Sequence, residues 1–316
     1  MSETLLDTLA DGAWHSGEAL AALAGITRAG LAKRVDKLRE LGLDVEARQG
    51  LGYRLAQPLE RLDAAALQAA APAGLRAQVV DSTDSTNRQL LDAPAALDPQ
   101  ALFAEYQTAG RGRRGRAWRS PYGANIYLSL AWSFAAWPPQ LTALPLSVGV
   151  ACARALRDVG LACVQLKWPN DLWVDRRKLG GILIEHRGEA GGACRVVVGI
   201  GINVAMSGAQ ADGIDQAWIS LDEALGATAS RNALAAALLR QLHAALGRFE
   251  HEGFAPFAAE WSALDLTRDQ PVQISGSTPV SGIARGVDDI GALIVEDANG
   301  QRRPQHSGDV SLRLAT

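Results

Sequence analysis

Apolar residues recur at helical spacing in three segments near the N-terminus, which are residues 5–9, 16–24 and 27–41. In the third segment leucine or valine returns every three or four residues, Thr27 can cap its start, and Gly42 can end it. Residues 43–48 and 53–55 flank a turn and predict a short hairpin. Three helices followed by a hairpin predict a winged helix-turn-helix.

Apolar runs of strand and helix length alternate after Pro58, which marks a linker. Strands are expected near residues 101–106, 125–132, 163–168, 179–186 and 194–204, and helices near 85–93, 140–158 and 230–250. From Gln270 short apolar runs are separated by glycines, which predicts a small antiparallel barrel. We therefore expect an α+β protein whose domains span residues 1–58, 59–268 and 269–316.

The composition is that of an ordinary globular protein, with 316 residues, 48% hydrophobic and 21% charged, and a net charge of -3. The sequence shows neither a secretory leader nor a membrane-spanning run, so we expect a cytoplasmic protein. Cys152, Cys163 and Cys194 are expected to be reduced residues of the core. Histidines and cysteines lack metal-ligand spacing, so no metal-ligand cluster is predicted.

Residues Gly110–Arg116 contain four arginines and three glycines, directly after a predicted strand. The glycines fit the dinucleotide motif G-x-G-x-x-G, but the helix and the acidic residue that this motif requires do not follow. One interpretation is a solvated basic loop. The other is a loop that wraps a polyanion such as a triphosphate or an acyl phosphate, because glycine allows close approach and arginine pairs with phosphate.

Charged residues also stand beside apolar strands in Lys167–Asp171, which reads K-W-P-N-D, and in Arg177–Leu183, which reads R-K-L-G-G-I-L. Taken singly, Lys167 and Lys178 fit surface positions and Asp171 fits a turn. Their occurrence together with the arginine loop favours one shared site.

Two further segments combine polar or small residues with a predicted element. Asp84–Asn87 precedes a helix, so Asp84 or Ser85 can cap it, and the same helix start can bind polar ligand atoms. In the buried strand within Val196–Met206, two glycines, Gly199 and Gly201, would leave room for a ligand.

Together these motifs resemble the biotin protein ligase family, and the N-terminal unit resembles that of members that also repress the biotin operon. The resemblance spans almost the whole chain. It implies a class II synthetase-like central domain with a mixed sheet and a C-terminal SH3-like barrel. It also implies ATP-dependent ligation of biotin, through biotinyl-5'-AMP, to a lysine of a biotin carboxyl carrier protein, repression at operator DNA, and a homodimer through sheet edges.

The resemblance implies roles for individual residues as well. The biotin-binding residues would be Ser85, Thr86, Asn87, Gln107, Arg111, Gly112, Arg113, Lys178 and Gly181, with Arg111 to Arg113 in a loop that orders the adenylate. The nucleotide-binding residues would be Arg113, Asn170, Asn203 and Trp218, the last covering the adenine. Near the nucleotide side of the C-terminal unit would lie Arg285, Asp309 and Arg313, without an assigned role.

The first half of such a reaction joins two anions, which repel by about 4 kcal/mol at 4 Å with an effective dielectric of 20. Arg113 and Lys178 are the expected catalytic cations. Asp171 is the acidic residue inside a matched motif, so we expect it to orient the acceptor amine or accept its proton. Mg2+ should accompany ATP, held mostly by phosphate and water.

DNA binding is predicted from where charge is concentrated in residues 1–55, which carry seven lysines or arginines against eight acids. Five of the seven cations lie on or near the third helix, which would enter the major groove. The DNA-binding residues would be Arg28, Lys33, Arg34, Lys37 and Arg48 of the wing. The alternative is a module for dimerisation or a vestigial appendage.

Two other functions stay open from the sequence. A lipoate or other acyl ligase would need similar cations to form its adenylate. A transcription factor that senses biotin without ligase activity would keep the pocket and the N-terminal unit.

Overall fold

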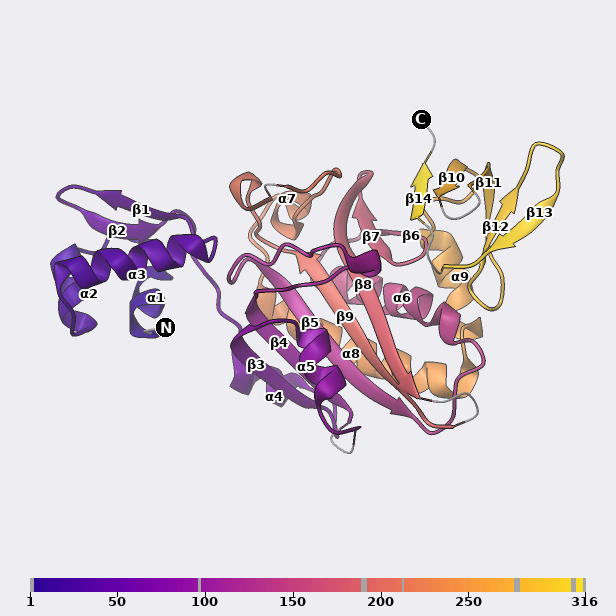
Figure 1. Cartoon of the computed structure of the whole chain (residues 1–316), viewed down its shortest axis with the longest axis horizontal. Coiled ribbons are helices and arrows are strands. Elements are labelled where there is room, and N and C mark those ends of the chain that lie inside the picture. The colour runs from indigo at the N-terminus through magenta and orange to yellow at the C-terminus, as the bar shows by residue number, and fades with distance from the viewer. Residues whose placement is uncertain are drawn as a thin grey trace.

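The computed structural model describes residues 3–95, 98–188, 192–211, 213–275, 279–307 and 311–314. Three units follow one another along the long axis of the molecule (Figure 1). The N-terminal unit lies at one end, the C-terminal sheet lies at the other, and a large sheet with its helices lies between them. The predicted order of domains is therefore the spatial order.

The N-terminal unit is a winged helix-turn-helix, as predicted. Its elements are α1 (Glu3–Leu9), α2 (Gly17–Leu23), α3 (Arg28–Glu40), β1 (Val45–Arg48) and β2 (Gly52–Leu55). The side chain of Ser16 caps α2 and that of Thr27 caps α3, and the apolar face of α3 is buried. The backbone of His15 pairs with Tyr53, so the wing is anchored on the turn before α2.

The central unit is built on a mixed seven-stranded sheet in the order β3-β4-β5-β9-β8-β7-β6. The strands are β3 (Arg76–Thr83), β4 (Gln100–Gln107), β5 (Asn125–Phe134), β6 (Gln165–Lys167), β7 (Asp171–Val174), β8 (Arg177–Gly188) and β9 (Cys194–Asn203). β3 and β4 are parallel and the other neighbours are antiparallel. The five expected strands are present, and two strands that were not among them, β3 and β7, complete the sheet.

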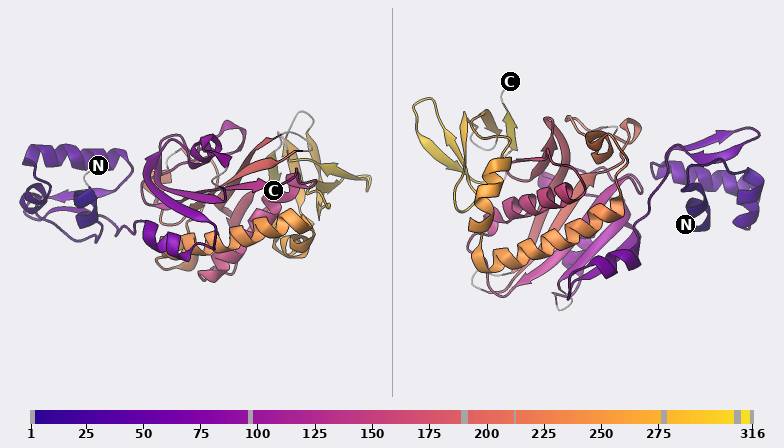
Figure 2. Two further views of the ribbon diagram at one scale, coloured as in Figure 1. Left: turned by 90° about the horizontal axis from the view of Figure 1, so that it is seen from below. Right: turned by 180° about the vertical axis from the view of Figure 1, so that it is seen from behind.

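Helices cover the two faces of this sheet unequally. The helices of the central unit are α4 (Ala64–Ala70), α5 (Thr86–Asp92), α6 (Leu144–Asp158), α7 (Leu221–Leu225), α8 (Arg231–Glu252) and α9 (Ala255–Leu264). α6, α8 and α9 lie together behind the sheet, whereas α5 lies on the front (Figures 1 and 2). The back face forms the main core, and the front face is left partly open for a site.

An ion pair joins two of the covering helices. On α6, Arg154 and Arg157 contact Glu260 of α9 at 2.7 Å each. Burial raises the pKa of Glu260, but the hydrogen bonds and charges of the two arginines outweigh it and lower the pKa below its usual range. Glu260 therefore stays ionised and holds α9 against α6.

The C-terminal unit is a five-stranded antiparallel sheet in the order β13-β12-β11-β10-β14. Its strands are β10 (Pro271–Ser275), β11 (Val280–Val287), β12 (Leu293–Glu296), β13 (Arg302–Gln305) and β14 (Ser311–Leu314). The indole of Trp168 donates to the carbonyl of Gly291 at 3.1 Å, which ties this unit to the central one. Cys152 and Cys194 are buried as expected, but Cys163 is exposed, so the prediction that all three lie in the core is wrong for Cys163.

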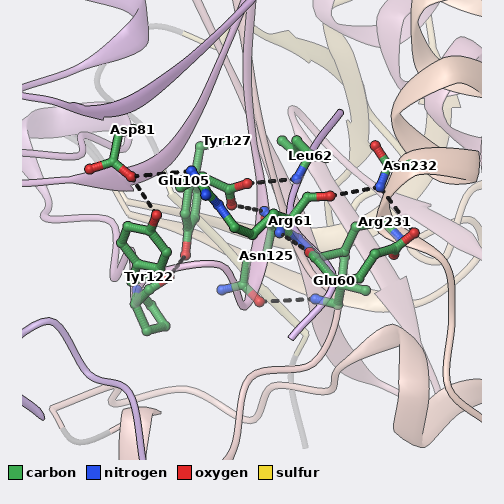
Figure 3. Close-up of polar contacts among 12 residues, drawn as sticks. Glu60, Arg61, Leu62, Asp81, Glu105, Tyr122, Asn125, Tyr127, Arg231 and Asn232 are labelled. Carbon is green, nitrogen blue, oxygen red and sulfur yellow. Dashed lines mark hydrogen bonds and ion pairs between the residues drawn. The ribbon is translucent and has the colours of Figure 1, made fainter. Parts of the chain in front are cut away.

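The linker between the first two units is fixed by a buried polar network (Figure 3). Arg231, at the start of α8, donates to Glu105 at 2.8 Å and to the carbonyl of Glu60 at 2.6 Å. The second carboxylate oxygen of Glu105 accepts the backbone N–H of Leu62 at 2.6 Å. Arg231 and Glu105 are 2% and 1% exposed, so this pair is fully removed from water.

Tyr122 joins the winged unit to the central sheet. Its ring is part of the apolar cluster of the winged unit, and its backbone N–H donates to the carbonyl of Leu41 at 3.1 Å. Its hydroxyl donates to Asp81, which Arg61 approaches at 3.7 Å (Figure 3). Burial and this hydrogen bond raise the pKa of Tyr122, so the phenol remains a donor.

Candidate active site

A cavity of about 900 Å³ opens on the front face of the central sheet. Strands β5, β8 and β9 form its floor, while the start of α5, the loop from Gly110 to Trp118, and the turn between β6 and β7 form its walls. Every ligand-binding or catalytic residue predicted from the sequence lines it, namely Ser85, Thr86, Asn87, Gln107, Arg111, Gly112, Arg113, Asn170, Asp171, Lys178, Gly181, Asn203 and Trp218. Residues up to 133 positions apart, from Ser85 to Trp218, thus share one space.

Register across the sheet explains the shape of the floor. Ser129, Gly199 and Leu183 stand opposite one another on three neighbouring strands, as do Tyr127, Gly201 and Gly181 in the next row. These six residues point to the same face, because directly paired residues of antiparallel strands share a face. Each row therefore has a glycine at its centre.

The two central glycines admit side chains from the walls. A Cβ atom at Gly199 would lie 2.2 Å from the Asn87 amide oxygen, and one at Gly201 would lie 2.5 Å from the Trp118 ring. The side chains of Asn87 and Trp118 become part of the cavity wall. Both glycines also line the cavity, so the expectation that they leave room for a ligand stays a prediction.

The start of α5 presents polar groups to the cavity. Ser85 holds the N-cap position as predicted, but its side chain makes no capping hydrogen bond. Instead the amide oxygen of Gln107 accepts the backbone N–H of Thr86 at 3.0 Å, and the Gln107 amide nitrogen donates to Ser120 at 3.2 Å. The hydroxyl of Ser85 is thus not used to cap the helix.

The arginine loop is a tight hairpin. Arg111 pairs with Ala117, and the N–H of Trp118 donates to the carbonyl of Gly110 at 2.8 Å. Gly110 has no room for a Cβ atom, which would lie 2.7 Å from Ser120 Oγ, and Gly115 has a positive φ of 70°. Two of the three glycines are therefore required by the backbone, and the loop carries its arginines on a defined turn.

Arg113 lies where three parts of the chain meet. Its guanidinium donates to the side chain of Asn170 at 3.2 Å and to the backbone carbonyl of Ser307 in the C-terminal unit. Asn170 in turn donates to the carbonyl of Ile182 at 2.6 Å. Leu312 of β14 also lines the cavity, so the C-terminal unit contributes directly to the site.

The C-terminal residues named from the sequence contribute little that the structure describes. Arg285 pairs with Asp269 at 2.6 Å and Glu296 at 2.9 Å inside its own unit and is absent from the cavity lining. Asp309 and the side chain of Arg313 lie outside the described residues.

Lys178 and Asp171, which both line the cavity, form an ion pair of 2.8 Å, and their side chains are 15% and 19% exposed. The ammonium group of Lys178 also lies 5.7 Å from the centre of the Trp118 ring. The backbone of Lys178 pairs with Trp218, whose strand-like segment is held by Asn203 through the carbonyl of Ile219 at 3.3 Å. Arg113 and Lys178 thus supply two cations to one cavity.

Two polar residues that contact the start of α5, Glu185 and Ser129, were not predicted from the sequence. Glu185 of β8 accepts from the Asn87 amide at 2.9 Å and from Arg111 at 3.1 Å. Ser129, which is fully buried on β5, contacts both Thr86 and Asn87. Neither belongs to a motif, and only the strand register brings them under α5.

The chemistry of the cavity favours an anionic ligand with a flat polar or apolar body. Its lining includes arginines and lysines, tryptophan rings and the hydroxyls of α5. The indole N–H groups of Trp118 and Trp173 find no acceptor among the described residues and are buried. Within the described ranges, no three His, Cys, Asp or Glu side chains gather closely enough to hold a metal ion.

The cations predicted to bind DNA lie on the surface of the winged unit. Lys33 and Lys37 are exposed on α3, Arg48 is exposed on β1, and Arg28 pairs with Glu18 at 3.2 Å in full solvent. Arg34 is only half-exposed. Among the described residues, no helix has both the length and the apolar composition needed to cross a membrane.

Three family profiles match the chain. The profile described as "Biotin/lipoate A/B protein ligase family" matches residues 77–203, "Biotin protein ligase C terminal domain" matches residues 269–313, and "HTH domain" matches residues 2–54. The three matches follow the three units of the fold.

Whole-length relatives agree with the profiles. The "Bifunctional ligase/repressor BirA" of Salmonella typhimurium is 45% identical over 99% of this chain and 97% of its own length. The Escherichia coli protein of the same name is 44% identical over 98% and 97%. The solved biotin protein ligase from Aquifex aeolicus in complex with biotin and ATP has a TM-score of 0.64 at 27% identity, covering 76% of this chain and 99% of that chain.

Proposed function

The chain belongs to the biotin protein ligase family, in its bifunctional ligase and repressor form, and on that premise we propose a two-step reaction and a regulatory role for it. The enzyme activates biotin with ATP as biotinyl-5'-AMP and transfers it to a lysine of a biotin carboxyl carrier protein. The winged unit represses biotin synthesis genes at operator DNA. The observation that carries the ligase is the shared cavity of Arg113 and Lys178.

In the first step a biotin carboxylate oxygen attacks the α-phosphorus of ATP, and the bond from that phosphorus to the bridging oxygen of pyrophosphate breaks. Arg113 and Lys178 offset the repulsion of the two anions and stabilise the charge that builds on the phosphate. Asp171 positions Lys178 through their 2.8 Å contact. The wall formed by Ser85, Thr86 and Gln107 holds the biotin head, with Gly112 and Gly181 beside it.

In the second step the acceptor amine attacks the acyl carbon, and AMP leaves. Deprotonation of a lysine amine whose pKa is near 10.4 requires roughly 4.6 kcal/mol at pH 7. A nearby base that accepts this proton therefore accelerates the transfer. We assign this role to Asp171, whose carboxylate is released as Lys178 turns to the adenylate phosphate. Single-turnover transfer from preformed biotinyl-adenylate tests it: Asp171→Asn slows transfer, and an unchanged rate removes the role.

The nucleotide side of the cavity is formed by Asn170, Asn203 and Trp218, with Trp218 against the adenine. Mg2+ bound to ATP would supply positive charge that neutralises the triphosphate, and it would be held chiefly by phosphate and water, because no three metal-ligating side chains gather among the described residues. The exposed cations of α3 and β1 contact operator phosphates. We place the protein in the cytoplasm, where operator DNA is found, as a homodimer through sheet edges.

Incubation with ATP and labelled biotin, lipoate or octanoate discriminates the remaining alternatives. We expect an adenylate with biotin. An adenylate only with lipoate or octanoate would identify a different acyl ligase, which the name of the first family profile also covers. No adenylate with any acid would leave a biotin sensor.

A further inference from the structure

Hydrogen bonds run without a break from Glu185 to the start of α5. Glu185 Oε2 accepts from Asn87 Nδ2 at 2.9 Å, and Asn87 Oδ1 lies 2.5 Å from Ser129 Oγ. Ser129 Oγ lies 2.7 Å from Thr86 Oγ1, which lines the cavity. Asn87, Ser129 and Thr86 are at most 4% exposed, so water does not compete within the chain.

The acceptors around Asn87 settle the orientation of its amide. A carboxylate and a backbone carbonyl can only accept, and Asn87 faces both Glu185 and the Leu183 carbonyl, the latter at 3.2 Å. The NH2 group of Asn87 must therefore point to β8. Its oxygen is left to face Ser129, and it can only accept there.

The direction of the next two hydrogen bonds follows from this. Ser129 has one hydroxyl hydrogen, which goes to the Asn87 oxygen, so Ser129 Oγ must accept the hydroxyl hydrogen of Thr86. The 2.7 Å contact of Thr86 with Ser129 is shorter than its 3.2 Å contact with Gln107, in agreement with this direction. Because its hydroxyl hydrogen is donated to Ser129, Thr86 Oγ1 can only accept hydrogen bonds from a ligand in the cavity.

We propose that Glu185 is a positioning residue that fixes the cavity wall as an acceptor for N–H groups. It acts through Asn87 and Ser129 on Thr86 and thereby selects an acid whose head group carries N–H donors, such as the cyclic urea of biotin. This inference deepens the proposed function and rests on it. An acid with a dithiolane or alkyl head has no N–H group, so it cannot donate a hydrogen bond to this wall.

Glu185 also joins this wall to the arginine loop. Both of its carboxylate oxygens lie 3.1 Å from Nη2 of Arg111, at the start of the loop. At the other end of the loop, Ser120 accepts from Gln107 and donates to the carbonyl of Trp118 at 3.1 Å. The loop is therefore tied to the biotin wall at both of its ends.

The test is a double-mutant cycle between Glu185→Ala and Thr86→Val, read as the Kd of biotin by isothermal titration calorimetry in the full-length chain. Each single change should weaken biotin binding about tenfold, because a buried hydrogen bond is lost or misdirected. The double variant should bind about tenfold weaker rather than a hundredfold, since both changes break one chain. Glu185→Gln, which keeps an acceptor, should lose only about threefold.

Two controls separate this effect from a general loss of structure. Glu252→Ala removes an exposed carboxylate on α8, behind the sheet, and should leave the biotin Kd unchanged. A circular dichroism spectrum like that of the parent should show that Glu185→Ala is folded.

A hundredfold loss in the double variant, or a Glu185→Ala protein within twofold of the parent, overturns the role of Glu185. Parent protein that forms no biotinyl-adenylate overturns the proposed function instead. The two failures are thus distinguishable, because the parent reaction is measured without any substitution.

Discussion

Replacing Glu105 with glutamine tests how strongly the buried network holds the linker. The Glu105 carboxylate accepts from Arg231 with one oxygen at 2.8 Å and from the Leu62 N–H with the other at 2.6 Å. A glutamine has the same shape but only one acceptor oxygen. In either orientation of the amide, its NH2 group, which is a donor, faces the donor of either Arg231 or Leu62.

The expected loss follows from the distance and the burial. Two unit charges 2.8 Å apart attract by about 6 kcal/mol at an effective dielectric of 20. The desolvation of both groups offsets part of this, but glutamine leaves the Arg231 charge desolvated and unpaired. We therefore expect Glu105→Gln to lower the free energy of unfolding by about 3 to 5 kcal/mol.

Urea unfolding followed by tryptophan fluorescence measures this loss, with Glu252→Gln as the matched exposed carboxylate. The control should lose less than about 1 kcal/mol, because its pair with Arg248 is half in solvent. Replacing both Glu105 and Arg231 with methionine should recover part of the stability, since no buried charge remains, although the Leu62 N–H and the Glu60 carbonyl lose their partners. Equal losses in Glu105→Gln and the control would refute the reasoning.

Three further outcomes follow from the site and the surface. Lys178→Ala should slow single-turnover formation of the adenylate by roughly 100- to 1000-fold. Arg113→Gly should mainly let the adenylate, once formed, escape to water. Equal retention of adenylate by the parent and by Arg113→Gly would contradict the role of the loop. The two arginines of α6 lower the pKa of Glu260 in the folded protein. Ionised Glu260 therefore stabilises the folded protein above the pKa that it has in the unfolded chain. This contribution is lost as the pH falls through the lower pKa of the folded state. Glu260→Gln should therefore cost about 1 kcal/mol at pH 7 and nothing at pH about 2, as urea titrations at both values can show. Lys33→Ala and Lys37→Ala should each reduce the slope of log Kd for operator DNA against log salt by roughly 1, and unchanged slopes would remove them from the DNA interface.

Residues inside motifs could be assigned to one cavity from the sequence because the chemistry itself was visible there. Arginines among glycines, a lysine beside a glycine pair, and hydroxyls at a helix start each point to an anion or a polar ligand. The winged unit could be predicted as well, because the helical spacing of apolar residues in its three helices and its hairpin turn are local patterns.

Contacts that depend on strand register could not be read in the same way. Glu185 reaches Asn87 across 98 positions, and Ser129 reaches it across 42, through pairings that no local pattern encodes. Gly199 and Gly201 were expected to leave room for a ligand, but the sequence does not show that Asn87 and Trp118 reach over them. Tyr122 was likewise not singled out from the sequence, yet it completes the core of the winged unit.

The contact between Gly201 and the Trp118 ring restricts how these enzymes can diverge. Any side chain at position 201 would collide with the indole, and any smaller residue at position 118 would leave a void above the strand. The two positions should consequently change in concert during evolution. A relative that has acquired alanine in place of the glycine is expected to have exchanged the tryptophan for something slimmer.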